Sequence, residues 1–184
     1  MALADTTASS DFDSSAARAL FEVTNFEYFT QVYMHRVWPY YPFIHIATFD
    51  YERASLPLLL AVFLTGALHA PPTSSAVSAR RFLNLAEEFI FSHPTMKGLL
   101  LNHDSPFEPA TEVIEILQAG LAILYTQISI NDEATRCRIR VKRYPFLSTV
   151  VRLVGILQAK HPIPVPSYDA NDWNTFIMWE SCIR

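Results

Sequence analysis

Cysteine and glycine are scarce in this 184-residue sequence, and positive charges are not in excess. The two cysteines, Cys137 and Cys182, lie far apart, which fits neither a disulfide framework nor a zinc-ligand pattern and favours a reducing compartment. The formal net charge is −4, whereas attraction to a polyanion needs clustered lysine and arginine. We therefore do not expect this chain to read DNA itself.

Long apolar runs and a targeting segment are also lacking. The most hydrophobic stretch, Leu56 to Leu68, has the length of a buried core helix rather than of a membrane span. Residues 1–15 have acidic and hydroxyl side chains but no basic start, so they do not resemble a signal peptide. These residues have too little apolar surface to bury to offset the entropy lost on ordering, so we expect a disordered lead-in. One domain is expected to follow over 16–184, and no membrane partner is expected.

Catalytic and metal-binding motifs are missing as well. The sequence has no nucleophile elbow, glycine-rich phosphate loop, kinase signature or pair of metal-binding carboxylates at helical spacing. The six histidines include no HExxH pair, and with the two cysteines they form no known zinc spacing. We therefore expect no enzyme, no catalytic or metal-binding residue, and no cofactor in this chain.

What the sequence does have is helical periodicity, which predicts an all-α fold, an irregular multi-helix array. Glycine, at 4 residues, is rare, and most of the 12 prolines fall between the periodic segments, where they do not interrupt a helix. We predict helices over 24–38, 55–68, 75–91, about 110–129, 132–157 with a kink at Pro145, and a last one from about 171. Because that last helix reaches the end of the chain, the array is expected to be truncated at its C-terminus.

Several local features refine this prediction. Thr24 and Glu27 have the spacing of a capping box, and Ser55 is placed to cap the second helix. Residues 39–45 alternate prolines and aromatics, which predicts an extended connector packed on the core. In 75–91, an apolar stripe is expected to face the core while the acidic residues Glu87 and Glu88 lie largely off it. The members of that stripe are Ala79, Phe82, Leu83, Ala86 and Ile90.

One run of the chain is basic: Arg136, Arg138, Arg140, Lys142 and Arg143. Such a run is found in nuclear-import and phosphate-contacting patches, and it is also what a solvated helix face looks like. On a regular helix Arg136, Arg140 and Arg143 would align on one side. The run therefore gives a weak candidate patch with both interpretations open.

The order of features resembles the fungal-specific transcription factor domain, also called the middle homology or xylanolytic-activator regulatory domain. The strongest match is Tyr28-Phe29, then Pro42-Phe43-Ile44-His45, then Thr48-Phe49. Further matches are a leucine-rich helix with Gly66-Ala67, and a glutamine-alanine helix with Gln118-Ala119. The resemblance extends over about residues 20–184.

The end of the chain adds to the resemblance through Arg152 and Gly155, then Trp173 followed by Glu180 and Arg184. Ile183 stands where many members have a second basic residue. Glu180 is able to pair with Arg184 four residues on, or to act as a ligand contact or general acid. His45 is either a packing residue or a ligand and switch residue, because histidine titrates near neutrality.

The resemblance implies a nuclear regulator of RNA polymerase II transcription. In that family DNA and zinc are bound by a zinc cluster or paired zinc fingers, a module this sequence lacks. The implied partners are DNA through that module, other transcription proteins or the domain's own C-terminal half, and a small-molecule effector in an apolar pocket between helices. The alternative is a stand-alone helical module that binds proteins or small molecules without DNA binding.

Overall fold

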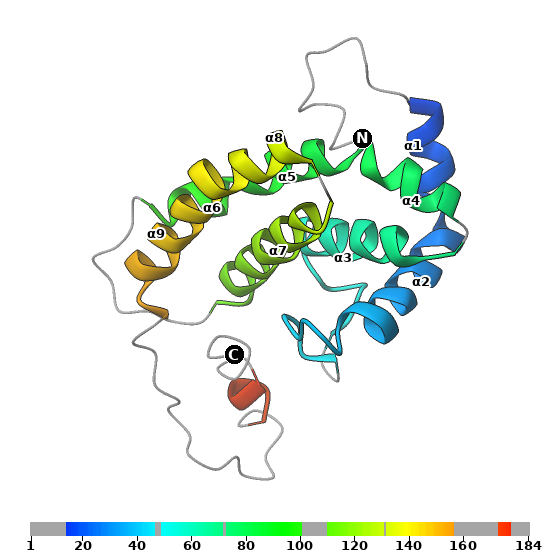
Figure 1. The fold of residues 1–184 in the computed structure, drawn as a ribbon. Coiled ribbons are helices and arrows are strands. Elements are labelled where there is room, and N and C mark those ends of the chain that lie inside the picture. Colours follow the sequence, from blue (N-terminus) through cyan, green and yellow to red (C-terminus); the bar gives the residue numbers. More distant parts are fainter. Residues whose placement is uncertain are drawn as a thin grey trace.

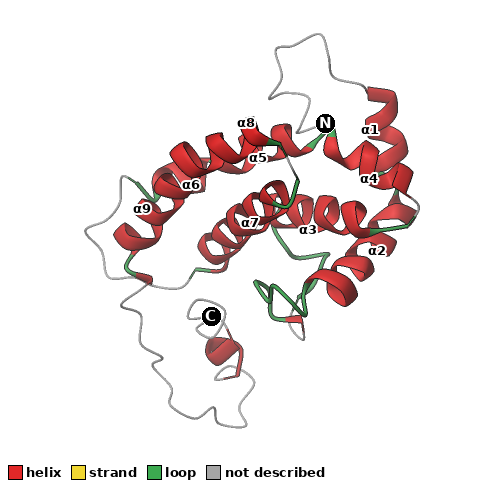
Figure 2. Cartoon of the chain, in the orientation of Figure 1, coloured by secondary structure: helices red, strands yellow, loops and turns green. Residues whose placement is uncertain are grey.

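The computed structural model describes residues 14–46, 49–71, 73–100, 110–130, 132–156 and 173–177. These residues form helices and no strands, so the predicted all-α array is confirmed (Figure 2). Two segments are π-helical, Tyr33–Val37 and Ile139–Arg143, and residues 173–177 form a further helical turn. The other helices are α1 (Ser14–Leu20), α2 (Val23–Val32), α3 (Leu56–His69), α4 (Thr73–Arg80), α5 (Leu83–Phe91), α6 (Pro94–Gly98), α7 (Thr111–Ile128), α8 (Glu133–Arg138) and α9 (Tyr144–Val154).

Helix α3 lies in the middle of the array, as its apolar composition predicts. In Figure 1 it runs between α2 and α7, and it also contacts α4 and α5. Its side chains Ala61, Leu64 and Ala67 are fully buried. Ser55 does stand at the N-cap, but its hydroxyl makes no capping hydrogen bond. Its backbone N–H donates to Oε2 of Glu115 on α7.

Helix α2 begins one residue before the predicted capping box. Glu22 occupies the N-cap position and no side chain caps the helix, so the expected pairing of Thr24 with Glu27 is wrong. The helix continues as a π-helical segment, in which the N–H of Trp38 donates to the carbonyl of Tyr33, five residues back, at 3.0 Å. The connector 39–45 then packs on the core as predicted, with Ile44 buried.

The predicted helix 75–91 is two helices, α4 and α5, separated at Arg81–Phe82. All five members of its apolar stripe are buried, which confirms that face. The placement of Glu87 off the stripe is wrong, because this side chain is only 1% exposed. The following segment, which lies outside the predicted helices, contains the short helix α6, which begins at Pro94.

Helices α8 and α9 with the π-helical segment between them form a long rod that runs alongside α5 (Figure 1). The expected interruption is present, since α9 starts at Tyr144 with Pro145 in its first turn. Helix α1 begins at Ser14, inside the segment expected to be disordered. Residues 1–13 lie outside the described part of the chain.

The N-cap of α8 is expected to depend on pH. Hydrogen bonds from the Thr135 side chain and backbone N–H, the latter at 3.0 Å, hold the pKa of Asp132 below its ordinary value. A lowered pKa in the folded state means that this stabilisation is complete above the ordinary carboxyl pKa of about 3.9 and is lost as the pH falls through the lower folded value. We expect the Thr135 amide shift in NMR spectra to titrate with a midpoint below 3.9. Asp132→Asn keeps the cap and should abolish the titration; a midpoint above 3.9, or an unchanged titration in the variant, would contradict the assignment.

Gly155 ends α9 in the left-handed region, with φ of 79°, and its N–H donates to the carbonyl of Arg152 at 3.1 Å. A Cβ is disfavoured in this conformation by about 1–2 kcal/mol. We therefore expect Gly155→Ala to lower the free energy of unfolding by about that amount in urea denaturation, and Gly155→Asn to lower it less. Equal stability of all three proteins would show that this turn is not under conformational constraint.

Candidate functional site

The basic run contributes two arginines to a buried carboxylate on α5. Arg138 contacts Glu87 with Nη2 to Oε2 at 2.8 Å and Nε to Oε1 at 3.2 Å. Arg143 donates from Nε to Oε1 of Glu87 at 2.6 Å. Glu87, Arg138 and Arg143 are called the arginine clamp below. The clamp joins α5 to the long rod across more than 50 residues of sequence.

The π-helical segment explains why these two arginines meet. On an α-helix, residues five apart are separated by about 140° around the axis, so Arg138 and Arg143 would point to different sides. In the segment Ile139–Arg143 the N–H of Tyr144 instead bonds to the carbonyl of Ile139, five residues back. The predicted alignment of Arg143 with Arg136 and Arg140 is therefore wrong, because one extra residue per turn rotates Arg143 toward Glu87.

Neighbouring side chains make further contacts with the two arginines of the clamp. Arg138 also donates to Asn84 at 2.8 Å and to Gln127 at 3.2 Å. Arg143 reaches Glu88 at 2.5 Å and lies over the ring of Phe91, 4.8 Å from its centroid. Hydrogen bonds from Ser92 and Arg143 lower the pKa of Glu88. Burial alone would lower the pKa of Arg143, but Glu87 and Glu88 outweigh it and the pKa is raised.

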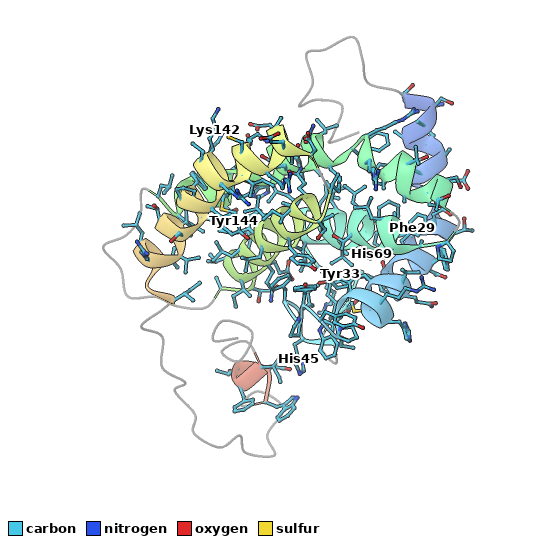
Figure 3. The ribbon with its side chains drawn as sticks, viewed as in Figure 1. Phe29, Tyr33, His45, His69, Lys142 and Tyr144 are labelled. Carbon is cyan, nitrogen blue, oxygen red and sulfur yellow. The ribbon has the colours of Figure 1, made fainter. Side chains whose placement is uncertain are left out.

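The clamp reduces the candidate basic patch. Arg138 and Arg143 are occupied by carboxylates, whereas Arg140 and Lys142 are exposed and Arg136 is half-buried. Lys142 points away from the body of the molecule in Figure 3. The run is thus a structural contact with a few exposed cations beside it.

A cavity of about 570 Å³ lies where four segments meet. One wall is the stretch of chain that leads to α3, with His45 and Phe49; from here on the name connector covers this whole stretch. Another wall is the N-terminal half of α7, with Glu115 and Gln118. The start of α3 and the helical turn 173–177 complete it. In Figure 3, His45 lies on the connector between the body of helices and this turn.

The cavity brings together residues that the sequence motifs place at opposite ends of the chain. His45 and Phe49 of the first motif line it, as does Ile177, four residues after Trp173. Trp173 itself stacks on Phe176, with ring centroids 5.7 Å apart, and Pro42 is exposed on the connector; neither is among the lining residues. Glu180 and Arg184, and so their expected pairing, lie outside the described residues.

Two polar residues of this site have no assigned role in the sequence prediction. Glu115 accepts the backbone N–H of Ser55 at 2.7 Å and so ties α7 to the start of α3. Gln118 is 8% exposed although it borders the cavity. The sequence does place Glu115 and Gln118 on a helix that is otherwise largely apolar. Polar side chains on a buried helix need hydrogen-bond partners, and this pattern could have marked both residues as candidate site residues.

The described residues contain no group of three or more histidine, cysteine or acidic side chains that is placed to hold a metal ion. Among them, no helix combines the length and the apolar character that crossing a bilayer requires.

Comparison with known proteins gives a distant relative. Over 147 residues, 79% of its length, the chain is 28% identical to the Penicillium polonicum protein named "Transcription factor verF". The chain spans about 20% of the length of that protein. No protein-family model matches the chain, and no solved structure matches it significantly. The similarity is thus to a fungal transcription factor, while the resemblance to the fungal-specific transcription factor domain continues to depend on the motif residues.

Proposed function

We propose that this chain is the helical regulatory part of a fungal transcription factor that acts in RNA polymerase II transcription in the nucleus. The observation that carries the proposal is the similarity to a fungal transcription factor along 79% of the chain. The meeting of the two motif regions at one cavity supports it, because residues of a shared regulatory site need to converge in space.

DNA and zinc are assigned to a module outside this sequence. The net charge of −4 opposes binding to a polyanion, and the arginine clamp withdraws two cations from the basic run. The regulatory part would act on other transcription proteins or on further segments of its own protein, with a small-molecule effector controlling the contact. No catalytic role is assigned to it.

A second function, a small-molecule-binding module without any role in transcription, is favoured by the cavity alone. Its volume falls within the range of about 300–1,000 Å³ that is usual for small-molecule sites. The two functions differ in one respect that is easily measured, namely whether the chain changes transcription when it is brought to a promoter.

The test is to fuse residues 1–184 to a heterologous DNA-binding domain in a fungal host and measure a reporter gene. We expect reporter expression to change several-fold relative to the DNA-binding domain alone, in either direction. The matched control carries Gly66→Ala, because a Cβ at this position overlaps the backbone of Phe29 and should disrupt the helical array. A fusion that is present at normal levels and leaves expression unchanged would contradict a regulatory role and favour the second function.

A further inference from the structure

The cavity contains a buried side chain that lacks a partner. Gln118 is 8% exposed and borders the open space, and its amide makes no hydrogen bond with any other described residue. The amide is accessible from the cavity, so a partner that enters this space can hydrogen bond to its polar atoms. Water can serve when the cavity is otherwise empty, and a ligand with matching polar atoms can replace it.

The polar atoms around Gln118 restrict the charge of such a ligand. Glu115 lies one turn before it on the same face of α7, and Asp50 on the connector adds a second carboxylate. Arg53, also on the lining, is exposed and balances part of this charge. Two carboxylates and one guanidinium leave the charged part of the lining net negative, so an anion is repelled. A neutral head that carries N–H groups meets no such repulsion and can donate hydrogen bonds to the carboxylates.

The apolar part of the lining restricts the rest of the ligand. Ile44 and Leu58 are buried beside the cavity, and Ile114 and Ile177 close it from α7 and the 173–177 turn. Phe49 adds an aromatic ring from the connector. A ligand that fills this space therefore needs an apolar body attached to its polar head, as in most small-molecule sites.

We propose that the cavity binds an uncharged amphipathic molecule with an amide or lactam head, which pairs with the Gln118 side chain. A glutamine amide offers two donors and one acceptor, and the edge of a second amide complements it with two hydrogen bonds. Glu115 is placed to accept a further N–H from such a head, since one of its oxygens, Oε2, is occupied by Ser55. This inference rests on the proposed function only in calling the ligand an effector; binding itself is independent of transcription.

The experiment uses the whole chain labelled at isoleucine δ1 methyl groups and titrated with 3-phenylpropanamide in NMR spectra. Three isoleucines line the cavity, Ile44, Ile114 and Ile177, whereas Ile90 and Ile139 are buried elsewhere in the core. We expect shift changes at the three lining methyls and none at the other two. A probe of this size should bind with a Kd on the order of 1 mM.

Two matched comparisons identify the polar contact. Gln118→Met keeps the length of the side chain but removes its hydrogen bonds, and it should weaken binding by about tenfold while the urea midpoint shows a folded protein. The carboxylate 3-phenylpropanoate has the same apolar body and should bind more weakly than the amide. The proposal is overturned if the lining methyls do not respond at about 10 mM probe, if Gln118→Met binds equally well, or if the carboxylate binds better.

These outcomes are separate from those of the reporter test. Binding with no effect on the reporter would retain the pocket and remove the transcription role. A reporter effect without binding would support the regulatory role and overturn the proposed ligand, with water as the occupant of the cavity.

Discussion

Gly66→Ala is expected to lower the free energy of unfolding by at least about 3 kcal/mol, or to prevent folding altogether. Gly66 lies on α3 where α2 crosses it, and a Cβ there would overlap the backbone carbonyl oxygen of Phe29 and come within 2.7 Å of its carbonyl carbon. Because the clash is with backbone, no side-chain rotation relieves it and the two helices must separate. Urea denaturation followed by circular dichroism measures the effect.

Gly98 provides the matched control. It is the last residue of α6, its φ is negative, and a Cβ at this position meets nothing within 4 Å. Gly98→Ala should therefore be neutral or stabilising by up to about 1 kcal/mol. If both variants have the stability of the parent, α2 and α3 do not approach as closely as described here. The result would also remove the physical reason for the Gly66-Ala67 motif.

The second large effect concerns the arginine clamp. Replacing Arg138 and Arg143 together by methionine leaves Glu87, which is 1% exposed, without a cation. Breaking a buried ion pair from one side costs about 3–5 kcal/mol, and we expect a loss of this size in the urea-derived free energy of unfolding. The two arginines are partly exposed, at 32% and 20%. This exposure reduces the expected loss of stability only a little, because the residue that remains without a partner, Glu87, is the buried one.

Two further variants separate loss of the ion pairs from loss of charge in general. Adding Glu87→Met to the double variant removes the stranded carboxylate, and most of the lost stability should return. Replacing the exposed Arg140 and Lys142 by methionine removes the same net charge and should change stability by no more than about 0.5 kcal/mol per residue. If the triple variant is no more stable than the double one, Glu87 is not held by the arginines in the way described.

Local sequence patterns predict the helices whose ends are marked by residues close by in the sequence. Helix α7 extends over Thr111–Ile128, within a residue of the predicted bounds, because a periodic apolar stripe lies between polar flanking segments. The position of α3 followed from Ser55, Pro57 and the prolines after it. These signals act within a few residues, and they remain informative whatever the rest of the chain does.

The clamp could not be predicted in this way. A charged residue beside an apolar stripe is normally placed in solvent, and Glu87 is buried only because arginines 51 and 56 residues later pack against it. The π-helical segment that orients them adds one residue to a turn, and the basic run contains no proline or glycine to mark it. The interpretation of the run as a solvated helix face therefore holds for Arg140 and Lys142, which are exposed, but not for Arg138 and Arg143.

The candidate site was predicted in part. The motif residues His45 and Phe49 do border a cavity between helices, and residues next to Trp173 close it. The roles of Glu115 and Gln118 could not be read from sequence, because they depend on the connector, α3 and the 173–177 turn meeting on one face of α7. Contacts between four distant segments leave no periodic signal in any one of them.

The proposal that this chain is part of a DNA-binding regulator of transcription is tested most directly by full-length sequencing of the transcript from its locus. We expect the reading frame that contains these 184 codons to include a cysteine-rich or cysteine- and histidine-rich zinc module, with helical sequence continuing beyond Arg184. A transcript that encodes these residues with no zinc module would contradict the claim, and would leave a ligand- or partner-binding protein without its own means of contacting DNA.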